Sequence, residues 1–212
     1  MPQPKIGVLI SGSGTNLQAL IDNVENGFIN GEISVVISNK ESAYGLERAR
    51  QHNIDAVFVN QKSYENFEEF NNAIIDELNA RDVNLVVLAG YLKILSGSFI
   101  ETYRNKIINI HPSLIPSFCG KGYYGLRVHE AAISYGVKMS GATVHFVDEE
   151  ADSGPIILQD AVPVDYNDTA ETLQQKVLRT EHMLLPLAVK YFCDGRLEVT
   201  GRKVRIIEQA AQ

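Results

Sequence analysis

The amino-acid sequence predicts an α/β protein with a doubly wound, mostly parallel sheet and antiparallel strands in its C-terminal half. Three observations predict this fold. From residue 5 to residue 111, short apolar runs alternate with segments whose apolar residues recur at helical spacing. Most of these runs are apolar on both faces, as strands covered by helices on both sides must be. Two later runs are separated by only six residues, too few for a helical crossover, so those strands should be antiparallel.

Five strands are expected in the first half of the chain. Each is a short run rich in β-branched residues, and all but the third are nearly apolar throughout. Repeated strand, helix, strand units imply right-handed crossovers, which place the strands parallel in a sheet with helices on both sides. The expected strands are residues 5–11, 32–38, 55–60, 84–90 and 106–111.

Two of the intervening segments carry a clear helical stripe. The first stripe follows the spacing i, i+3, i+4 and i+7, and Gly27 stands where its helix would end. The second stripe has Ser63 available as its N-cap. The stripes consist of Leu17, Leu20, Ile21 and Val24, and of Phe67, Phe70, Ile74 and Leu78.

The second half of the chain changes character. Strands are expected at residues 141–148 and 155–164, with Asp152 on the loop between them. A long helix over about residues 169–193 follows, in which Pro186 should produce a kink. Residues 196–207 are typical of a small hairpin. With no internal repeat and no linker, residues 1–212 are expected to form a single domain.

Composition and charge exclude several classes of function. Hydrophobic residues make up 45% and charged residues 21%, which is typical of an ordered globular protein. The formal charge of −7 and the lack of a Lys or Arg block argue against nucleic acid and favour small-molecule partners. Without a signal peptide or an apolar run of the ~20 residues that span a membrane, we expect a cytoplasmic protein with no membrane partner. The two cysteines, Cys119 and Cys193, lack metal-ligand or redox spacing, so free thiols and no metal site are expected.

A glycine-containing turn follows the first strand. Gly12 and Gly14 allow close approach of the backbone to a ligand, and the helix that follows offers free N–H groups to a phosphate. The dinucleotide-binding pattern fails because Leu17 replaces its third glycine and no acidic residue ends the second strand. A Gly-Lys-Ser/Thr sequence is also missing, which excludes the Walker pattern. The remaining prediction is a site for one phosphate at Gly14, Thr15 and Asn16; the alternative is a tight turn with no ligand.

The fifth strand ends with two polar residues in the run "IINIHPS". Asn109 and His111 lie two residues apart, on one face at the carboxyl end of the strand, where open α/β sheets bind ligands. A carboxamide can donate to a developing oxyanion, and an imidazole can exchange a proton beside it, so the pair suits acyl transfer. Asp152 is the candidate carboxylate that would raise the pKa of His111 toward neutrality. The alternative is a polar strand end with a hydrogen-bonded core histidine.

Six segments resemble one family closely: "SGSGTNL", "SNKESAYGLERA", "VVLAGYLKILS", "INIHPSLIPSF", "GATVHFVDEEADSGPII" and "RTEHMLLPL". In this order, from residue 6 to about residue 196, they are similar to the phosphoribosylglycinamide formyltransferases, folate-dependent enzymes of purine synthesis. The resemblance implies the Rossmann-like formyltransferase fold. It also implies direct transfer of a formyl group from 10-formyltetrahydrofolate to the amine of 5′-phosphoribosylglycinamide. The expected partners are these small molecules, with no nucleic acid and no membrane, and the protein is expected to be a monomer or homodimer.

The resemblance also assigns roles to residues. Asn109, His111 and Asp152 would be catalytic, and Gly14, Thr15 and Asn16 would bind the ribose 5-phosphate. Glu181 would hold the glycinamide portion, although the residue alone is typical of a solvated helix carboxylate. Leu92 and Leu95 are typical of core residues by periodicity alone, and His145 would line the cleft or simply pack. The expected folate-binding residues are Leu92, Lys93, Ile94, Leu95, Asn109, Asp148, Glu149, Glu150, Ala151 and Asp152.

The sequence departs from the family pattern in three places. Lys93 replaces an arginine of many relatives, and Phe67 stands where relatives often carry a basic residue near the glutamate end of folate. Residues 119–128 differ from the shorter segment of other members, and their three glycines suggest a mobile lid. Of these departures, Phe67 is the one that concerns the family's contact with the folate tail.

Three rival functions share parts of this pattern. Methionyl-tRNA formyltransferases carry a C-terminal RNA-binding domain, for which this chain has no residues. Formyltetrahydrofolate hydrolases usually carry an N-terminal regulatory domain, whereas the expected sheet begins at residue 5. A non-catalytic phosphate-binding protein would have no need of Asn109, His111 and Asp152 together.

Overall fold

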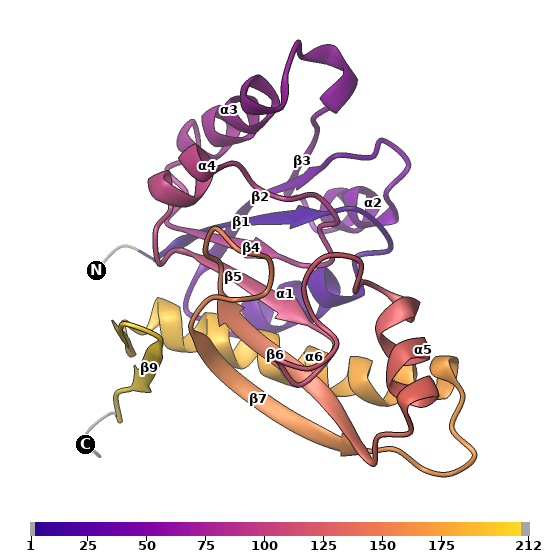
Figure 1. Ribbon diagram of the computed structural model, residues 1–212. Coiled ribbons are helices and arrows are strands. Elements are labelled where there is room, and N and C mark those ends of the chain that lie inside the picture. Colours follow the sequence, from indigo (N-terminus) through magenta and orange to yellow (C-terminus); the bar gives the residue numbers. More distant parts are fainter. Residues whose placement is uncertain (1–2, 209–212) are drawn as a thin grey trace. The chain divides into compact units, whose positions relative to one another are not determined.

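A computed structural model describes residues 3–208 of the chain (Figure 1). It contains two compact units, which meet in the sequence between Ile108 and Asn109. The two units are described separately below. The expectation of a single domain over residues 1–212 stays a prediction.

The first unit contains a parallel sheet. Its strands are ordered β3-β2-β1-β4, and β1 pairs in parallel with both β2 and β4. The strands β1 to β3 are added on one side of β1, and the chain then crosses to its other side to form β4. The switch point therefore lies between β1 and β4 in the sheet, and open α/β sheets bind ligands at such a point, beyond the carboxyl ends of the strands. The four strands are β1 (Lys5–Ile10), β2 (Glu32–Ser38), β3 (Asp55–Phe58) and β4 (Leu85–Leu88).

The helices of the first unit bury most residues of the predicted stripes, but not Val24 and Phe67. Leu17, Leu20 and Ile21 are at most 1% exposed, and α1 contacts α2, while α3 contacts α4. The left-handed Gly27 follows α1 closely, as expected of a residue that ends a helix. The helices are α1 (Thr15–Glu25), α2 (Tyr44–Gln51), the 3₁₀ turn η1 (Gln61–Ser63), α3 (Phe67–Asn79) and α4 (Gly97–Thr102).

The predicted N-cap of α3 is wrong. Ser63 belongs to η1, and the cap is Asn66, whose side-chain oxygen accepts a hydrogen bond from the backbone N–H of Glu69 at 2.9 Å. Phe67 is therefore the first residue of the helix and is 41% exposed. The buried stripe of α3 begins at Phe70, one turn later than the sequence pattern suggested.

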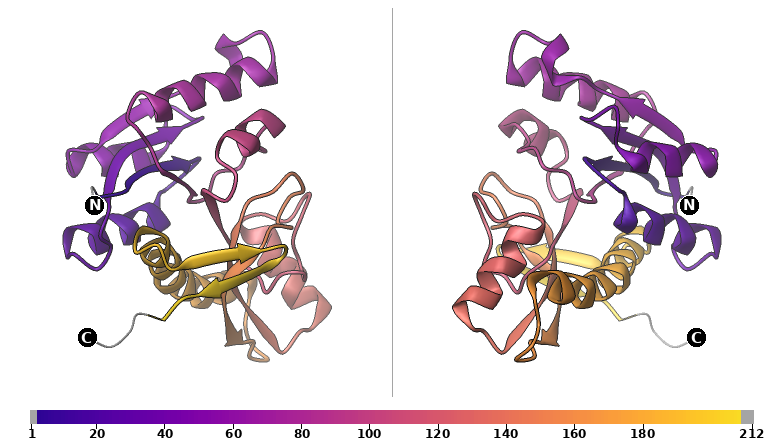
Figure 2. Two further views of the ribbon diagram at one scale, coloured as in Figure 1. Left: turned by 90° about the vertical axis from the view of Figure 1, so that its left-hand side faces the viewer. Right: turned by 90° about the vertical axis from the view of Figure 1, so that its right-hand side faces the viewer.

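The second unit contains the antiparallel strands. β5 (Ile107–His111) runs across the boundary of the units, and the strands from β5 onward are ordered β5-β6-β7-β9-β8. β6 (Met139–Phe146) pairs antiparallel with β7 (Ile156–Pro163), and β8 (Leu197–Thr200) forms a hairpin with β9 (Lys203–Ile206), shown in yellow in Figure 2. β9 also pairs with β7 at Ile156 and Lys203. The predicted fold class is confirmed.

Two helices complete the second unit. α6 (Ala170–Cys193) packs on β6, β7 and α5 (Leu126–Tyr135), and Thr169 and Thr172 form a capping box at its start. The helix includes Pro186 as one of its buried residues; the kink expected there stays a prediction. Both cysteines are free thiols, as predicted. Within residues 3–208, no helix has the length and apolar character required to cross a membrane.

Candidate active site

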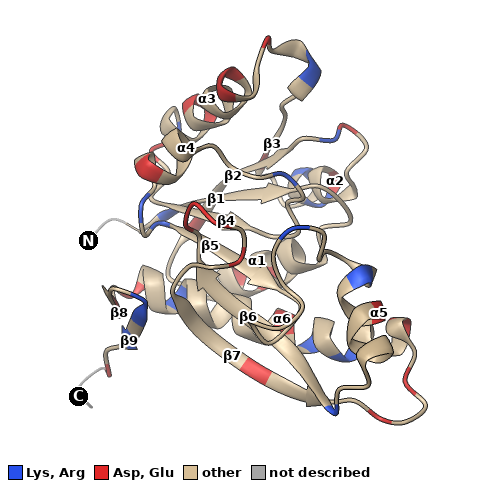
Figure 3. Ribbon diagram, in the orientation of Figure 1, with Lys and Arg blue, Asp and Glu red and all other residues tan. Residues whose placement is uncertain are grey.

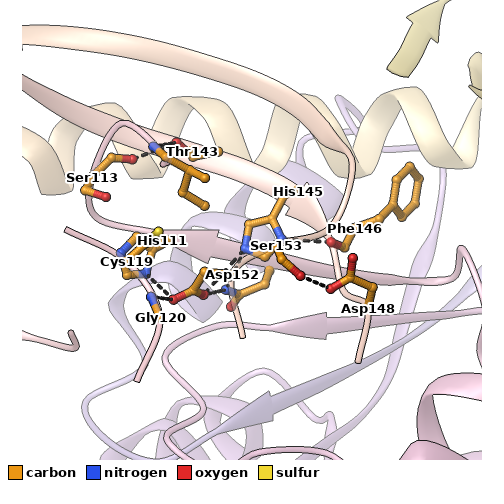
Figure 4. Close-up of polar contacts among 12 residues, drawn as sticks. His111, Ser113, Cys119, Gly120, Thr143, His145, Phe146, Asp148, Asp152 and Ser153 are labelled. Atoms are coloured by element: carbon orange, nitrogen blue, oxygen red, sulfur yellow. Dashed lines mark hydrogen bonds and ion pairs between the residues drawn. The ribbon is translucent and has the colours of Figure 1, made fainter. Parts of the chain in front are cut away.

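Three predicted catalytic residues come together in the second unit. Along β5, Ile108 and Ile110 are buried on one face, so Asn109 and His111 project from the other. Asp152 lies on the loop between β6 and β7. Its carboxylate is 3.5 Å from His111, measured from Oδ2 to Nδ1 (Figure 4). Oδ1 accepts a hydrogen bond from the Asn109 amide at 3.5 Å. A carboxamide, an imidazole and a carboxylate thus form one cluster.

His145 on β6 completes this cluster. Its Nδ1–H donates to the carbonyl of Phe146 at 2.8 Å, which leaves Nε2 facing Asn109 and Asp152. That nitrogen is hydrogen-bonded to the Asn109 amide nitrogen at 3.1 Å and lies 3.7 Å from Asp152. Asn109 therefore points its NH₂ group at both partners, and the longer of its two hydrogen bonds, to Asp152, is the easier one to redirect to a ligand.

The segment after Pro116 contacts both His111 and Asp152. His111 donates from Nε2 to the carbonyl of Phe118 at 2.9 Å, and the backbone N–H of Gly120 donates to Asp152 Oδ2 at 2.8 Å. Phe118 and Gly120 both have positive φ, 49° and 84°, which turns these backbone groups toward the cluster. Because Nε2 already carries its proton, Nδ1 is the nitrogen of His111 that can gain one, and it faces Asp152.

The pKa of His111 differs from the prediction. Burial lowers the pKa of this imidazole, and the nearby Asp152 carboxylate and the Phe118 carbonyl only partly offset that effect. The ring is 4% exposed, so the cost of desolvating the imidazolium outweighs the attraction to the carboxylate. The expected rise of the pKa toward neutrality is therefore wrong. His111 is neutral at pH 7.

Asp152 keeps its charge despite partial burial. Burial alone would raise the pKa of its carboxyl group, but His145, His111 and the N–H of Gly120 together lower it. The loop that carries it is rich in acidic residues, as the red segment between β6 and β7 in Figure 3 shows. Asp152 also has a φ of 55°, a left-handed conformation that aspartate and asparagine tolerate better than most residues.

Neighbouring groups hold this loop in place. Ser153 donates to the side chain of Asp148 and to the carbonyl of Glu150, and the Ser153 carbonyl accepts a hydrogen bond from Arg202 at 2.6 Å. Arg202 lies in the turn between β8 and β9, so the C-terminal hairpin contacts the residue next to Asp152. The side of Gly154 where a Cβ would stand faces the carbonyl of Phe146, so a side chain cannot be added without moving the loop.

The predicted phosphate loop lies in the first unit. Gly14 has φ 71° and ψ 33°, and α1 begins directly after it at Thr15. The N-cap residue Gly14 has no side chain that could cap the helix, so the helix start is capped by no hydrogen bond from that position. Ser11 donates to Asn39 at 2.6 Å. Asn39 follows the second strand, where a dinucleotide-binding protein carries its acidic residue. Here the Asn39 side chain accepts the hydrogen bond from Ser11 instead.

The predicted folate-binding segment 92–95 follows β4. Leu92 and Ile94 are 52% and 68% exposed, whereas Leu95 is 6% exposed. Periodicity alone predicts that Leu92 and Leu95 are core residues. This prediction is wrong for Leu92 and is confirmed for Leu95. The backbone N–H of Leu92 donates to Ser11 Oγ at 2.9 Å, so within the first unit this segment adjoins the start of the glycine turn. Binding of folate here stays a prediction.

Glu181 lies on α6 in the second unit. It is 8% exposed, and its neighbour Thr180 is 4% exposed. The alternative of a solvated helix carboxylate is therefore wrong. A buried carboxylate is kept in proteins where it has partners. The role of Glu181 in holding the glycinamide portion stays a prediction.

His129 on α5 is a further buried histidine of the second unit. The ring is 1% exposed, and its Nδ1 finds no hydrogen-bond partner among the described residues. Burial, with a contribution from the charge of His111, lowers the pKa of His129 to about 4. No pattern in the sequence distinguishes it from the other histidines.

The protein should lose stability as the pH falls. A buried histidine with a lowered pKa stabilises the fold above its unfolded-state pKa of about 6.5, and this contribution is lost as the pH falls toward about 4. For His129 alone the loss is on the order of 3 kcal/mol, at 1.36 kcal/mol per pKa unit. Chemical denaturation at pH 7.5 and pH 4.5 measures it. His129→Leu should reduce the change in unfolding free energy between the two pH values. Tyr135→Leu, at an exposed site on the same helix, should leave that change as in the wild type. The same change in His129→Leu as in the wild type would contradict the role given to His129.

The comparison with known proteins decides the family. A model of the family described as formyl transferase matches residues 4–189. The chain belongs to the formyl transferase family. The family predicted from the sequence motifs, its fold and its class as a formyl-transferring enzyme are confirmed. Membership of this family implies a folate-derived formyl donor.

Two relatives of this formyl transferase match nearly their whole length. A phosphoribosylglycinamide formyltransferase from Haemophilus influenzae is 45% identical over 195 residues, which are 92% of this chain and 90% of that protein. The crystal structure of glycinamide ribonucleotide transformylase 1 from Symbiobacterium toebii has a TM-score of 0.93 and 47% identity, and covers 97% of this chain and 95% of that one.

A third, more distant similarity concerns one of the rival functions. The crystal structure of a formyltetrahydrofolate deformylase from Pseudomonas syringae has a TM-score of 0.88 and 28% identity to this formyl transferase. The match covers 97% of this chain and 66% of that one.

Among residues 3–208, no three His, Cys, Asp or Glu side chains are placed to hold a metal ion together.

Proposed function

We propose that the protein transfers the formyl group of 10-formyltetrahydrofolate to the primary amine of 5′-phosphoribosylglycinamide. The observation that carries this proposal is the contact of Asp152 with both Asn109 and His111, at 3.5 Å each, in a chain of the formyl transferase family. Similarity over nearly the whole length of a phosphoribosylglycinamide formyltransferase supports the choice of acceptor. The reaction would take place in the cytoplasm, with small molecules as the only partners of a monomer or homodimer.

The chemistry follows from the protonation states. The substrate amine attacks the formyl carbon, a C–N bond forms, and the carbonyl electrons move to oxygen. The NH₂ group of Asn109 donates to that oxygen by giving up its longer hydrogen bond, the one to Asp152. Neutral His111 accepts the proton released by the amine at Nδ1, beside Asp152, and returns it to the departing folate nitrogen as its bond to carbon breaks. Asp152 stabilises the imidazolium formed between these steps.

The binding roles are assigned separately for each substrate. Gly14, Thr15 and Asn16 bind the ribose phosphate through backbone N–H groups at the start of α1. Glu181 holds the glycinamide portion. The folate contacts residues 92–95, where two exposed aliphatic side chains offer an apolar surface, and the acidic loop 148–152.

A substrate-exchange assay tests the proposal. Loss of formyl from 10-formyltetrahydrofolate is followed spectroscopically with glycinamide ribotide, charged initiator tRNA or water alone as acceptor. Turnover is expected only with the ribotide. Equal loss of formyl with water alone would establish the hydrolase instead, which is the rival that the deformylase similarity favours. Formylation of the tRNA would establish a methionyl-tRNA formyltransferase.

A further inference from the structure

Helix α2 holds the glycine turn through its backbone. The carbonyl of Gly12 accepts a hydrogen bond from the N–H of Gly45 at 3.1 Å, and the carbonyl of Ser13 accepts one from Arg48 Nε at 2.9 Å. The contact is close, because a Cβ built on Gly14 would lie 2.7 Å from Gly45 Cα. Both Gly45 and Arg48 come from the segment "GLER", to which neither the sequence motifs nor the proposed function gives a role.

These contacts fix the directions in which the N–H groups of the turn point. In a trans peptide the C=O and N–H bonds point in opposite directions. With the carbonyls of Gly12 and Ser13 directed at α2, the N–H groups of the next residues, Ser13 and Gly14, are directed away from it. The carbonyl of Gly14 accepts from Gln18 within α1 at 2.9 Å, which turns the N–H of Thr15 out of the helix start. Successive N–H groups arranged in this way form a concave site for an anion.

Arg48 is itself held on several sides. Its Nη1 donates to Gln18 Oε1 at 3.0 Å, and its guanidinium carbon lies 5.0 Å from the centre of the Tyr44 ring. Gln18 is held in turn by Asp22 at 2.8 Å and by His52 at 3.2 Å. The half-buried guanidinium therefore bridges the turn and α1 in one fixed geometry. A lysine would keep the charge but could not make both hydrogen bonds in this planar arrangement.

We propose that Arg48 is a positioning residue for the phosphorylated substrate: it holds the Ser13–Gly14 peptide so that its N–H group faces the phosphate. This inference rests on the proposed function, which places the ribose phosphate at Gly14, Thr15 and Asn16. Arg48 acts through the backbone of the turn and does not touch the reacting atoms. Its loss weakens binding of the phosphate and leaves the chemical step intact once substrate is bound.

Steady-state kinetics of Arg48→Gln and Arg48→Lys tests the inference. A hydrogen bond from a charged group contributes enough to predict a roughly 10- to 100-fold rise in KM for the ribotide in both variants. The kcat value and the KM for folate should stay within about threefold of the wild type. Gln18→Ala, which removes only one partner of Arg48, should give a smaller rise. Arg50→Gln is the matched control, because Arg50 lies on the same helix with its side chain 57% exposed.

A binding measurement separates this inference from the proposed function. Ribose 5-phosphate is titrated by calorimetry without folate, and thermal unfolding verifies that each variant is folded. Binding by the wild type and an affinity at least 10-fold lower for both Arg48 variants would support the inference. Wild-type affinity in Arg48→Lys would show that charge alone matters and would overturn it, as would unchanged affinity in both variants. Absence of binding and of formyl transfer in the wild type would instead refute the proposed function, and the inference with it.

Discussion

Replacing His111 with alanine is expected to lower kcat by ~100-fold or more, with a modest effect on the KM of either substrate. In the proposed mechanism the imidazole moves the proton from the attacking amine to the folate nitrogen, so its contribution would arise after the substrates are bound. The measurement is steady-state formyl transfer, with thermal unfolding to verify that the variant is folded. More than a tenth of the wild-type kcat in His111→Ala would remove the residue from the mechanism.

The pH dependence of kcat in the wild type tests the same role of His111. Because burial lowers the pKa of His111, the ring is neutral and able to accept a proton at pH 7. The kcat value should therefore be flat around neutrality and fall as the pH drops below 6.5 toward the lowered pKa. A rate that rises on acidification would mean that protonated His111 is the active form.

Asp152→Asn is expected to lower kcat by a similar factor, ~100-fold or more. Asparagine tolerates the φ of 55° and can still accept from Gly120, so the loop should keep its shape while the charge beside His111 Nδ1 is lost. Since this charge raises the pKa of His111, the acid limb of the profile should also move to lower pH.

The control for this variant is Asp160→Asn. Asp160 is an exposed carboxylate on β7 that accepts from the N–H of the residue that follows it, and its replacement should leave kcat unchanged. A full rate for Asp152→Asn across the whole pH range would rule out the stabilising role of the carboxylate.

Much of the fold could be predicted because its signals are local. The strand β2 was predicted with both ends correct, and the others differ by at most two residues at either end, because apolar runs bounded by polar residues mark buried strands. The N-cap of α3 was missed because Ser63 and Asn66 are both good caps, and the short 3₁₀ turn that decides between them has no periodicity of its own.

The sequence predicted which residues lie together in the candidate site, but not the direction of the pKa shift of His111. Asn109 and His111 follow from strand alternation, and the motif of the β6–β7 loop supplied Asp152. The sign of the His111 pKa shift was wrong because it depends on burial by a loop that the sequence does not place. The contacts of Phe118 and Gly120 depend on positive φ values, and the former is a residue type that rarely adopts them.

The hydrogen bond from Arg202 to Ser153 has a consequence for synthesis of the enzyme. The loop that bears Asp152, the predicted catalytic carboxylate, receives this contact from the turn between β8 and β9, and β7 pairs with β9 at Ile156. A ribosome reaches that turn only after it has made every other element that contributes to catalysis. We therefore expect nascent chains that stop before β8 to contain Asn109, His111 and Asp152, to lack the hydrogen bond that holds the loop of Asp152, and to transfer formyl groups poorly.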